Sequence, residues 1–283
     1  MQKRIVTTEF SVRGGLKRFE NISSKFRIEK FQGAVMNKAQ IDIANLARED
    51  VEYLTTYTSY ALALQQRKRL RISAGYEGQD VALLFDGDIS EALPTAPPDV
   101  WLKCQAISGY YNNQTLLTKS IDSPTSVKQL ALNIANTLGL ELDWRASSEK
   151  AIGSFNYIGG GSKLINEFNR LGNFIAFEED GKLKVVDKII KADKLAASAK
   201  VLSAESGLID MPQPNALGLS AKMLLDPTVA CGSLVKLESK RIPAANGFYW
   251  VYKLTHEGGL RENSFYTTIE RSEEHTSELQ SRE

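Results

Sequence analysis

Two groups of acidic residues are the first candidates for chemistry, because glycan hydrolases act through a pair of carboxylates. Asp86 and Asp88 form one group, and Glu178, Glu179 and Asp180 form the other. Both groups fall in segments whose composition predicts turns, where acidic side chains favour the turn geometry and stay in contact with water. A pair of solvated turns is therefore the favoured interpretation, ahead of a hydrolytic site.

Cysteine and histidine are scarce, which limits nucleophilic and metal chemistry. Cys104 and Cys231 lie far apart in the sequence and indicate two buried thiols in a reducing compartment, with a disulfide as the minor alternative. A Cys-His pair with His256 would have to be assembled in space, and no local motif favours it. Zinc sites need several ligands at characteristic spacing. His256 is expected at a strand end in a polar turn, and no catalytic, metal-binding or cofactor-binding residue is assigned.

Residues 159–163 read Gly-Gly-Gly-Ser-Lys and precede a predicted helix, as a phosphate-binding loop would. A P-loop has Gly directly before its Lys and Ser or Thr directly after it. Here Ser162 precedes Lys163 and Leu164 follows it. A flexible turn with Ser162 as the helix N-cap is favoured over a nucleotide site, and no cofactor is expected.

The basic run Arg-Lys-Arg-Leu-Arg at residues 67–71 is the one concentrated cationic segment. It lies between a predicted helix and a predicted strand, so a solvated face or a subunit contact is favoured over nucleic-acid binding. The whole chain of 283 residues carries 35 Lys and Arg against 34 Asp and Glu. This near-neutral balance lacks the electrostatic footprint of a protein that binds nucleic acid or an anionic membrane.

The C-terminal residues match a sequence that does not come from a natural protein. Residues 271–281 read Arg-Ser-Glu-Glu-His-Thr-Ser-Glu-Leu-Gln-Ser, the translation of a widely used sequencing-library adapter. We expect residues 271–283 to be an artefactual tail and exclude them from the fold. His275 is thereby excluded as a functional residue, and the natural C-terminus beyond Glu270 stays open.

Composition and patterning predict a soluble globular protein whose core is large enough for one or two domains. Apolar residues make up 42% and charged residues 24% of the chain. The N-terminus has no apolar stretch of the kind that signal peptides carry, and no segment approaches the roughly 18 apolar residues of a membrane span. No membrane partner is expected.

Residues 1–121 predict mainly strands. Residues 26–31 and 39–44 alternate apolar and polar side chains, the period of a half-buried strand. Residues 48–66 place apolar side chains at helical intervals behind an acidic first turn, so we expect a helix there. Further strands are expected at 70–76, 81–85 and 101–107, separated by turns at 77–80 and 86–87 and by a Pro-rich loop at 93–98.

Residues 122–199 change to a mixed pattern. Cap residues at 123–126 open a helix that ends at Gly139, and its apolar stripe comprises Val127, Leu130, Ala131, Ile134 and Leu138. A second helix is expected at 162–171, with Gly172 as its stop. Strands at 174–177 and 182–186 flank Glu-Asp-Gly at 179–181, which predicts a hairpin.

Residues 200–270 return to strands, expected at 217–225, 233–238, 248–255 and 265–269. The expected fold class is β-rich α+β. The expected domains are a first small β-barrel at 1–121, an α+β unit at 122–199, a second β-barrel at 200–270 and the artefactual tail at 271–283.

Two stretches resemble the late-control-protein-D-like family, the central hub proteins of phage tail baseplates. Residues 70–76 and 84–89 read Leu-Arg-Ile-Ser-Ala-Gly-Tyr and Leu-Phe-Asp-Gly-Asp-Ile, similar to the family's strand-turn-strand pattern. The second stretch is longer and resembles the family's second barrel in order and spacing. It contains Gly-Leu-Ile-Asp-Met-Pro at 207–212, Leu-Leu-Asp-Pro at 224–227, Gly-Ser-Leu-Val-Lys-Leu at 232–237, Gly-Phe-Tyr-Trp-Val at 247–251 and His-Glu-Gly at 256–258.

The resemblance covers most of residues 1–270 and implies two tail-tube-like barrels with an α+β element between them. It implies a homotrimer that presents six barrels in a ring, with the tail tube protein above and the central spike protein below. Other baseplate proteins would be further partners. The implied location is the virion tail after synthesis in the bacterial host cytoplasm, and the implied role is structural and not enzymatic.

Three alternatives stay open beside the hub. A tail-tube or distal-tail ring protein would share the machinery, although two barrels in one chain argue against it. A tail-associated peptidoglycan hydrolase would need a carboxylate or Cys-His site in a cleft. A secretion-system relative would share the fold, and contractile and non-contractile tails are equally compatible with the sequence.

Overall fold

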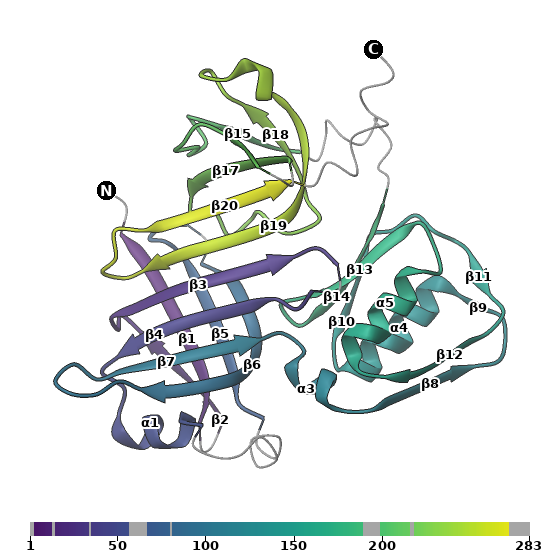
Figure 1. Ribbon diagram of the computed structural model, residues 1–283, viewed down its shortest axis with the longest axis horizontal. Coiled ribbons are helices and arrows are strands. Elements are labelled where there is room, and N and C mark those ends of the chain that lie inside the picture. Colours follow the sequence, from purple (N-terminus) through teal and green to yellow (C-terminus); the bar gives the residue numbers. More distant parts are fainter. Residues whose placement is uncertain are drawn as a thin grey trace.

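A computed structural model of the chain describes residues 3–12, 15–33, 35–56, 67–79, 81–188, 199–215 and 218–271 (Figure 1). Among them, one sheet of 13 strands runs in the order β16-β17-β20-β19-β3-β4-β7-β6-β5-β1-β2, with β18 paired to β19 and β15 paired to β18. Its N-terminal strands are β1 (Arg4–Val12), β2 (Gly15–Glu20), β3 (Ser24–Phe31), β4 (Lys38–Ala44), β5 (Arg69–Tyr76), β6 (Ala82–Pro94) and β7 (Trp101–Ile107).

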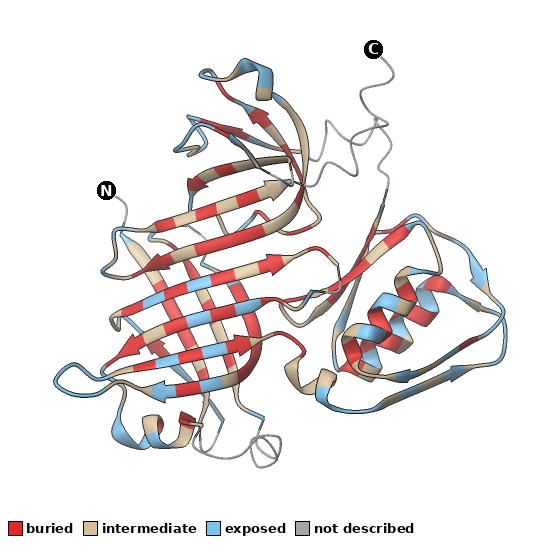
Figure 2. Cartoon of the chain, in the orientation of Figure 1, coloured by how far each residue is buried: buried red, intermediate tan, exposed pale blue. Residues whose placement is uncertain are grey.

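The N-terminal strands form where side chains alternate in polarity. Along β3, Phe26 and Ile28 are buried while Lys25 and Arg27 are exposed. Figure 2 shows the same alternation of buried and exposed residues along β4 and β7. The strands predicted at 26–31, 39–44, 70–76 and 101–107 are therefore confirmed. Their inward faces make a core that includes Phe10, Phe26, Ile28, Ile41, Ile72, Phe85, Leu102 and Ala106.

The predicted turn at Asp86–Gly87 is wrong, because both residues lie inside the 13-residue strand β6. Asp86 pairs with Arg71 of the neighbouring strand β5, which holds its carboxylate across the sheet. A Cβ atom on Gly87 would lie 2.5 Å from the ring of Phe85. The glycine therefore serves close side-chain packing within a strand, and Asp-Gly alone did not distinguish this from a turn.

The helix predicted at 48–66 is shorter than expected. Helix α1 (Arg48–Leu54) begins at the expected residue but stops after seven residues, and residues 57–66 lie outside the described part of the chain. Thr56 N donates to Ala92 O, and Ala92 N donates to the Thr56 hydroxyl. Because β6 takes both the backbone and the side chain of Thr56, the helical hydrogen bonds cannot continue there.

The middle unit packs two helices against a small sheet of β10 (Glu141–Trp144), β14 (Lys182–Asp187) and β13 (Phe174–Glu179). Helix α4 (Val127–Leu138) has Ser126 as its N-cap and a left-handed Gly139 as its C-cap, as predicted. Its predicted stripe is buried. Helix α5 (Gly161–Asn169) packs on β13 and completes this second core.

Ser162 is not the N-cap of α5, which corrects the prediction. The helix begins one residue earlier, with Gly160 in the cap position, and Ser162 N donates to Asn113 Oδ1 at 2.6 Å. Asn113 belongs to α3 (Tyr110–Gln114), so a side chain from another element satisfies the helix terminus. The predicted hairpin is confirmed, since Asp180 and Gly181 both have positive φ between β13 and β14.

Two short ribbons complete the middle unit on its outer side. Strand β8 (Leu117–Ile121) pairs with β12 (Phe155–Gly159), and β9 (Thr125–Ser126) pairs with β11 (Ala151–Ile152). In Figure 1 the β8–β12 ribbon runs below α4 and α5, from near α3 toward the end of the molecule that is away from the large sheet.

The C-terminal strands extend the large sheet. They are β15 (Lys200–Ser203), β16 (Gln213–Asn215), β17 (Gly218–Leu224), β18 (Leu234–Glu238), β19 (Gly247–Gly259) and β20 (Phe265–Arg271), with a 3-10 turn η1 (Pro243–Ala245) before β19. All four strands predicted after residue 200 are present. A third core lies here, including Leu202, Met223, Val235, Val251, Leu254 and Ile269.

The pairing of β3 with β19 joins the two ends of the chain in one sheet. The sheet is open, with β2 and β16 at the two ends of its path, and no closed barrel is formed by the described strands. The β-rich fold class is confirmed, while the two barrels and the domain boundaries stay predictions. Helices long and apolar enough to cross a membrane are absent from the described residues.

Candidate functional site

Charged side chains concentrate where the β13–β14 hairpin meets the large sheet. Figure 1 shows the turn of this hairpin reaching the end of β3. We call this region the junction. It comprises Lys30, Arg67, Arg69, Arg71, Asp86, Asp88, Glu178, Glu179, Asp180 and Lys184. The junction unites both acidic groups and the basic run that stand out in the sequence.

Lys30 is the central cation of the junction. Its Nζ lies 2.5 Å from Asp180 Oδ2 and 3.3 Å from Glu179 Oε1, and its side chain is only 4% exposed. Burial alone would lower the pKa of Lys30, but the two carboxylates outweigh it and raise the pKa above its ordinary value. Lys30 is therefore charged, and its stability in the interior depends on Glu179 and Asp180.

The sequence offered a sign of this buried lysine that was missed. Phe26, Ile28 and Lys30 share one face of β3, because side chains two residues apart point to the same side of a strand. A lysine at an inward position needs a buried partner of opposite charge.

Glu179 and Asp180 are held differently although they are neighbours. Glu179 is 1% exposed and also pairs with Lys184. Burial opposes ionisation of Glu179, but the two lysines win and lower its pKa. Burial raises the pKa of Asp180 despite its contact with Lys30. The turn is therefore formed as predicted. The prediction that its acidic side chains are solvated is wrong, because they are enclosed.

Three arginines of the basic run form ion pairs with the acidic group of Asp86 and Asp88. Arg67 Nε lies 2.7 Å from Asp88 Oδ1, and Arg69 Nη2 lies 2.8 Å from both carboxylate oxygens of Asp86. Arg71 Nε adds a contact of 3.0 Å to Asp86. Both aspartates are buried in β6. The basic run thus pairs with buried carboxylates, in contrast to the solvated face expected, and the predicted subunit contact stays a prediction.

Glu178 lies between the two parts of the junction. Burial, followed by repulsion from Asp88, raises its pKa to about 7. Its carboxylate fits against Gly109, where a Cβ atom would lie 2.4 Å from Glu178 Oε2. The backbone is also held, because Asn37 Nδ2 donates to Glu178 O at 3.0 Å.

The carboxylates of the junction are arranged to hold the β13–β14 hairpin on the large sheet. A hydrolytic pair needs carboxylates that face a substrate in a cleft. Asp86 and Asp88 already accept hydrogen bonds from arginines, and Asp88 also accepts one from Tyr111 N. None of these carboxylates lines either of two hollows on the described residues, one among the C-terminal strands and one beside α5. The geometry therefore fastens the hairpin to the sheet.

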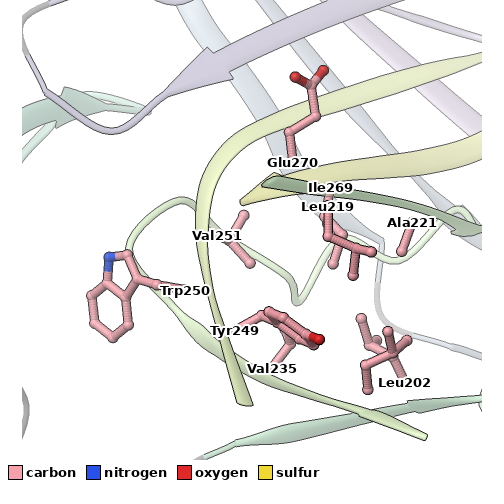
Figure 3. A pocket seen from close by; sticks show the side chains of 10 residues that line it. Leu202, Leu219, Ala221, Val235, Tyr249, Trp250, Val251, Ile269 and Glu270 are labelled. Carbon is pink, nitrogen blue, oxygen red and sulfur yellow. The ribbon is translucent and has the colours of Figure 1, made fainter. Parts of the chain in front are cut away.

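The first hollow is a small apolar cavity among C-terminal strands (Figure 3). Its volume of about 10 Å³ has room for one water at most. Figure 3 shows Leu202, Leu219, Val235, Tyr249 and Val251 around it, with Trp250 and Glu270 directed away. The lining residues are Leu202, Leu219, Ala221, Val235, Leu237, Tyr249, Trp250, Val251, Ile269 and Glu270. A substrate does not fit.

His256 lies in the middle of β19 and not at a strand end, which corrects the prediction. It is 1% exposed, and its Nδ1 lies 2.9 Å from Thr267 Oγ1 on β20. Burial, assisted by the charge of Lys30, lowers its pKa to about 3. Cys104 and Cys231 are free and buried as expected. Burial raises both thiol pKa values, to about 12 for Cys104, so thiolate chemistry is disfavoured.

The glycines before α5 serve close packing. A Cβ atom on Gly160 would lie 3.0 Å from Asn113 O, and one on Gly161 would lie 2.9 Å from Leu138. These contacts let α3 and α4 approach the start of α5, which accounts for two of the three consecutive glycines. In the described residues, no three His, Cys, Asp or Glu side chains are grouped to hold a metal ion.

Solved structures of tail proteins share this fold. The 43 kDa tail protein of prophage MuSo2 from Shewanella oneidensis matches with a TM-score of 0.63 and 7% identity, over 95% of this chain and 96% of that one. The tail protein from Neisseria meningitidis MC58 matches with a TM-score of 0.64 and 10% identity, over 96% and 97%. The E. coli c3393 protein, a component of the type VI secretion system, matches with a TM-score of 0.56 and 11% identity, over 92% of this chain and 75% of that one.

No curated protein matches the sequence. The family model for baseplate hub gp41 matches residues 5–271, which includes every strand of the large sheet except the first residue of β1. This match supports a structural role in a phage tail baseplate and a place in the virion tail. The chain therefore belongs to the baseplate hub gp41 family.

Proposed function

We propose that the chain forms a homotrimeric ring that joins the tail tube to the central spike. In this proposal residues 1–121 and 200–270 each build one tail-tube-like barrel, so that three chains present six similar units. The tube protein, the spike protein and other baseplate proteins are the partners, and the chain is made in the host cytoplasm. The role is structural and needs no catalytic group.

The observation that carries the proposal is the division of one continuous sheet into two halves. One core lies mainly among the N-terminal strands, with Leu225 and Phe265 added from the C-terminal part. Another lies mainly among the C-terminal strands, with Phe177 and Val186 added from the middle unit. The β3–β19 pairing joins these halves side by side. Two similar units per chain are what a three-fold hub needs in order to match a six-fold tube.

The open ends of the sheet support assembly further. Strands β2, β15 and β16 each pair with a single neighbour and are its edges, and five of the six residues of β2 are exposed. Exposed strand edges are usually covered or paired in assembled proteins. Head-to-tail contacts between chains would cover them.

The oligomeric state tests the proposal. We expect the full chain to form a trimer, measured as solution mass by light scattering after size exclusion. A hexamer would favour a tail-tube or distal-tail ring protein. A monomer that persists at high protein concentration would contradict self-assembly of the ring.

The peptidoglycan-hydrolase alternative has a separate test. Glu178 is its best candidate acid, because its pKa of about 7 suits proton donation. We expect the wild-type chain to leave the turbidity of a peptidoglycan suspension unchanged. Clearing that is lost in Glu178→Gln, with the trimer mass preserved, would establish the hydrolase and show that the role is not only structural.

A further inference from the structure

A hollow of about 660 Å³ lies on the outer side of the middle unit, between β12 and α5. We call it the α5 basin. Its residues are Tyr157, Ile158, Lys163, Asn166, Glu167, Asn169, Arg170 and Lys188. The volume is within the range that holds a short segment of polypeptide or a small ligand. It belongs to neither the junction nor the large sheet.

The basin carries more positive than negative charge. Arg170 Nη1 lies 2.9 Å from Glu167 Oε1, which neutralises both side chains. Lys163 and Lys188 have no ion pair with any described carboxylate. Lys163 and Asn166 on α5 and Arg170 at its C-cap form an exposed stripe. Two cations in one hollow, neither paired with a carboxylate of the described residues, are complementary to an acidic ligand.

The wall of the basin also offers a strand edge. Strand β12 pairs with β8 only, and its other edge forms no backbone hydrogen bond with the described residues. Such an edge can pair with an added strand. Ile158 lines the basin and is 69% exposed, and Leu116, just before β8, is 77% exposed. They are the two most exposed large apolar side chains among the described residues.

We propose that the α5 basin binds an extended acidic segment of a neighbouring tail protein. The backbone of that segment pairs with the free edge of β12, an apolar side chain covers Ile158, and carboxylates contact Lys163 and Lys188. The choice of a protein segment as the ligand rests on the proposed assembly role. Alternation of acidic and apolar residues is what a strand needs to place one kind on each side.

A labelled peptide tests the basin on the full chain. The probe is a fluorescein-labelled peptide of four Glu alternating with three Val, and its binding is followed by fluorescence anisotropy. We expect the double variant Lys163→Glu, Lys188→Glu to weaken binding at least tenfold, because both contacts become repulsive. The matched control, Lys25→Glu with Lys103→Glu, reverses two exposed charges on the large sheet and should leave binding unchanged.

Two further measurements, and the comparison of the two double variants, decide the nature of the ligand. N-methylation of alternate peptide nitrogens should abolish binding if the strand edge pairs with the backbone, and unchanged binding would contradict that pairing. Equal weakening by both double variants would show a general charge effect and overturn the site. Polyphosphate binding as tight as the peptide, with the same dependence on Lys163 and Lys188, would overturn a polypeptide ligand. The solution mass of the chain does not depend on these binding measurements. A basin that does not bind the peptide is therefore distinguishable from a chain that does not form the trimer.

Discussion

Replacing Lys30 with Met is expected to lower the free energy of unfolding by about 3–5 kcal/mol, measured by chemical denaturation. The variant keeps most of the side-chain volume but leaves Glu179 and Asp180 enclosed without their shared cation. Lys184 still pairs with Glu179, so Asp180 bears most of the loss. Breaking a buried ion pair costs more than replacing all of it, because the remaining charge is then uncompensated.

A compensating variant separates charge from packing. Adding Asp180→Asn and Glu179→Gln to Lys30→Met removes the stranded carboxylates, and we expect most of the lost stability to return. The exposed pair of Arg48 and Glu52 on α1 gives the matched control, and Arg48→Met should leave the free energy of unfolding almost unchanged, because water screens an exposed ion pair. If the triple variant is no more stable than Lys30→Met, the charges of the junction are not what holds the hairpin.

Glu178→Gln is expected to become more stabilising as the pH rises. The folded-state pKa of Glu178 is about 7 and its ordinary value is 4.5. Because the folded chain holds the proton more tightly, the favourable contribution of Glu178 is complete below pH 4.5 and is lost as the pH rises to 7. Gln imitates the protonated form at every pH. The stability difference between variant and wild type should therefore grow by up to about 3 kcal/mol between pH 4.5 and 8.

The measurement is denaturant unfolding of both proteins across this range. The groups that face Glu178 are Asp86, Asp88, Arg67 and Arg69, and they are unchanged in both proteins, so their own effects largely cancel. Exposed Glu91 on β6 provides the control, since its carboxylate is in water in both the folded and unfolded chains. A difference for Glu178→Gln that stays flat with pH would show that the carboxylate is solvated, in contradiction to its place beside Gly109.

Local sequence determined the elements whose geometry is set by neighbouring residues. Ser126 and Gly139 bound α4 as predicted, because caps act through hydrogen bonds and backbone angles within a few residues. Asp180 and Gly181 form the predicted hairpin turn because both adopt positive φ. Alternation of polarity located β3 and β4 correctly, since burial of one sheet face is visible at a period of two.

Partners distant in the sequence decided the rest. Asp86 and Gly87 have turn composition, yet Arg71 on the neighbouring strand β5 pairs with Asp86 and keeps this segment within β6. Helix α1 stops early because Ala92, far along the chain, takes the hydrogen bonds of Thr56. The local preference was for a turn at residues 86–87 and for a helix after residue 54, and tertiary contacts of larger energy overrode both.

The junction shows the same division at the level of the site. The acidic residues and the basic run stand out in the sequence. The acidic groups were expected in solvated turns, and the basic run on a solvated face or in a subunit contact. Lys30 and Asp180 are 150 residues apart, and only the approach of the hairpin to β3 makes them partners. Sequence alone thus determined which residues carry charge and which segments form strands. The tertiary structure decided which charges are buried together, because burial and pairing depend on distances that local patterns do not specify.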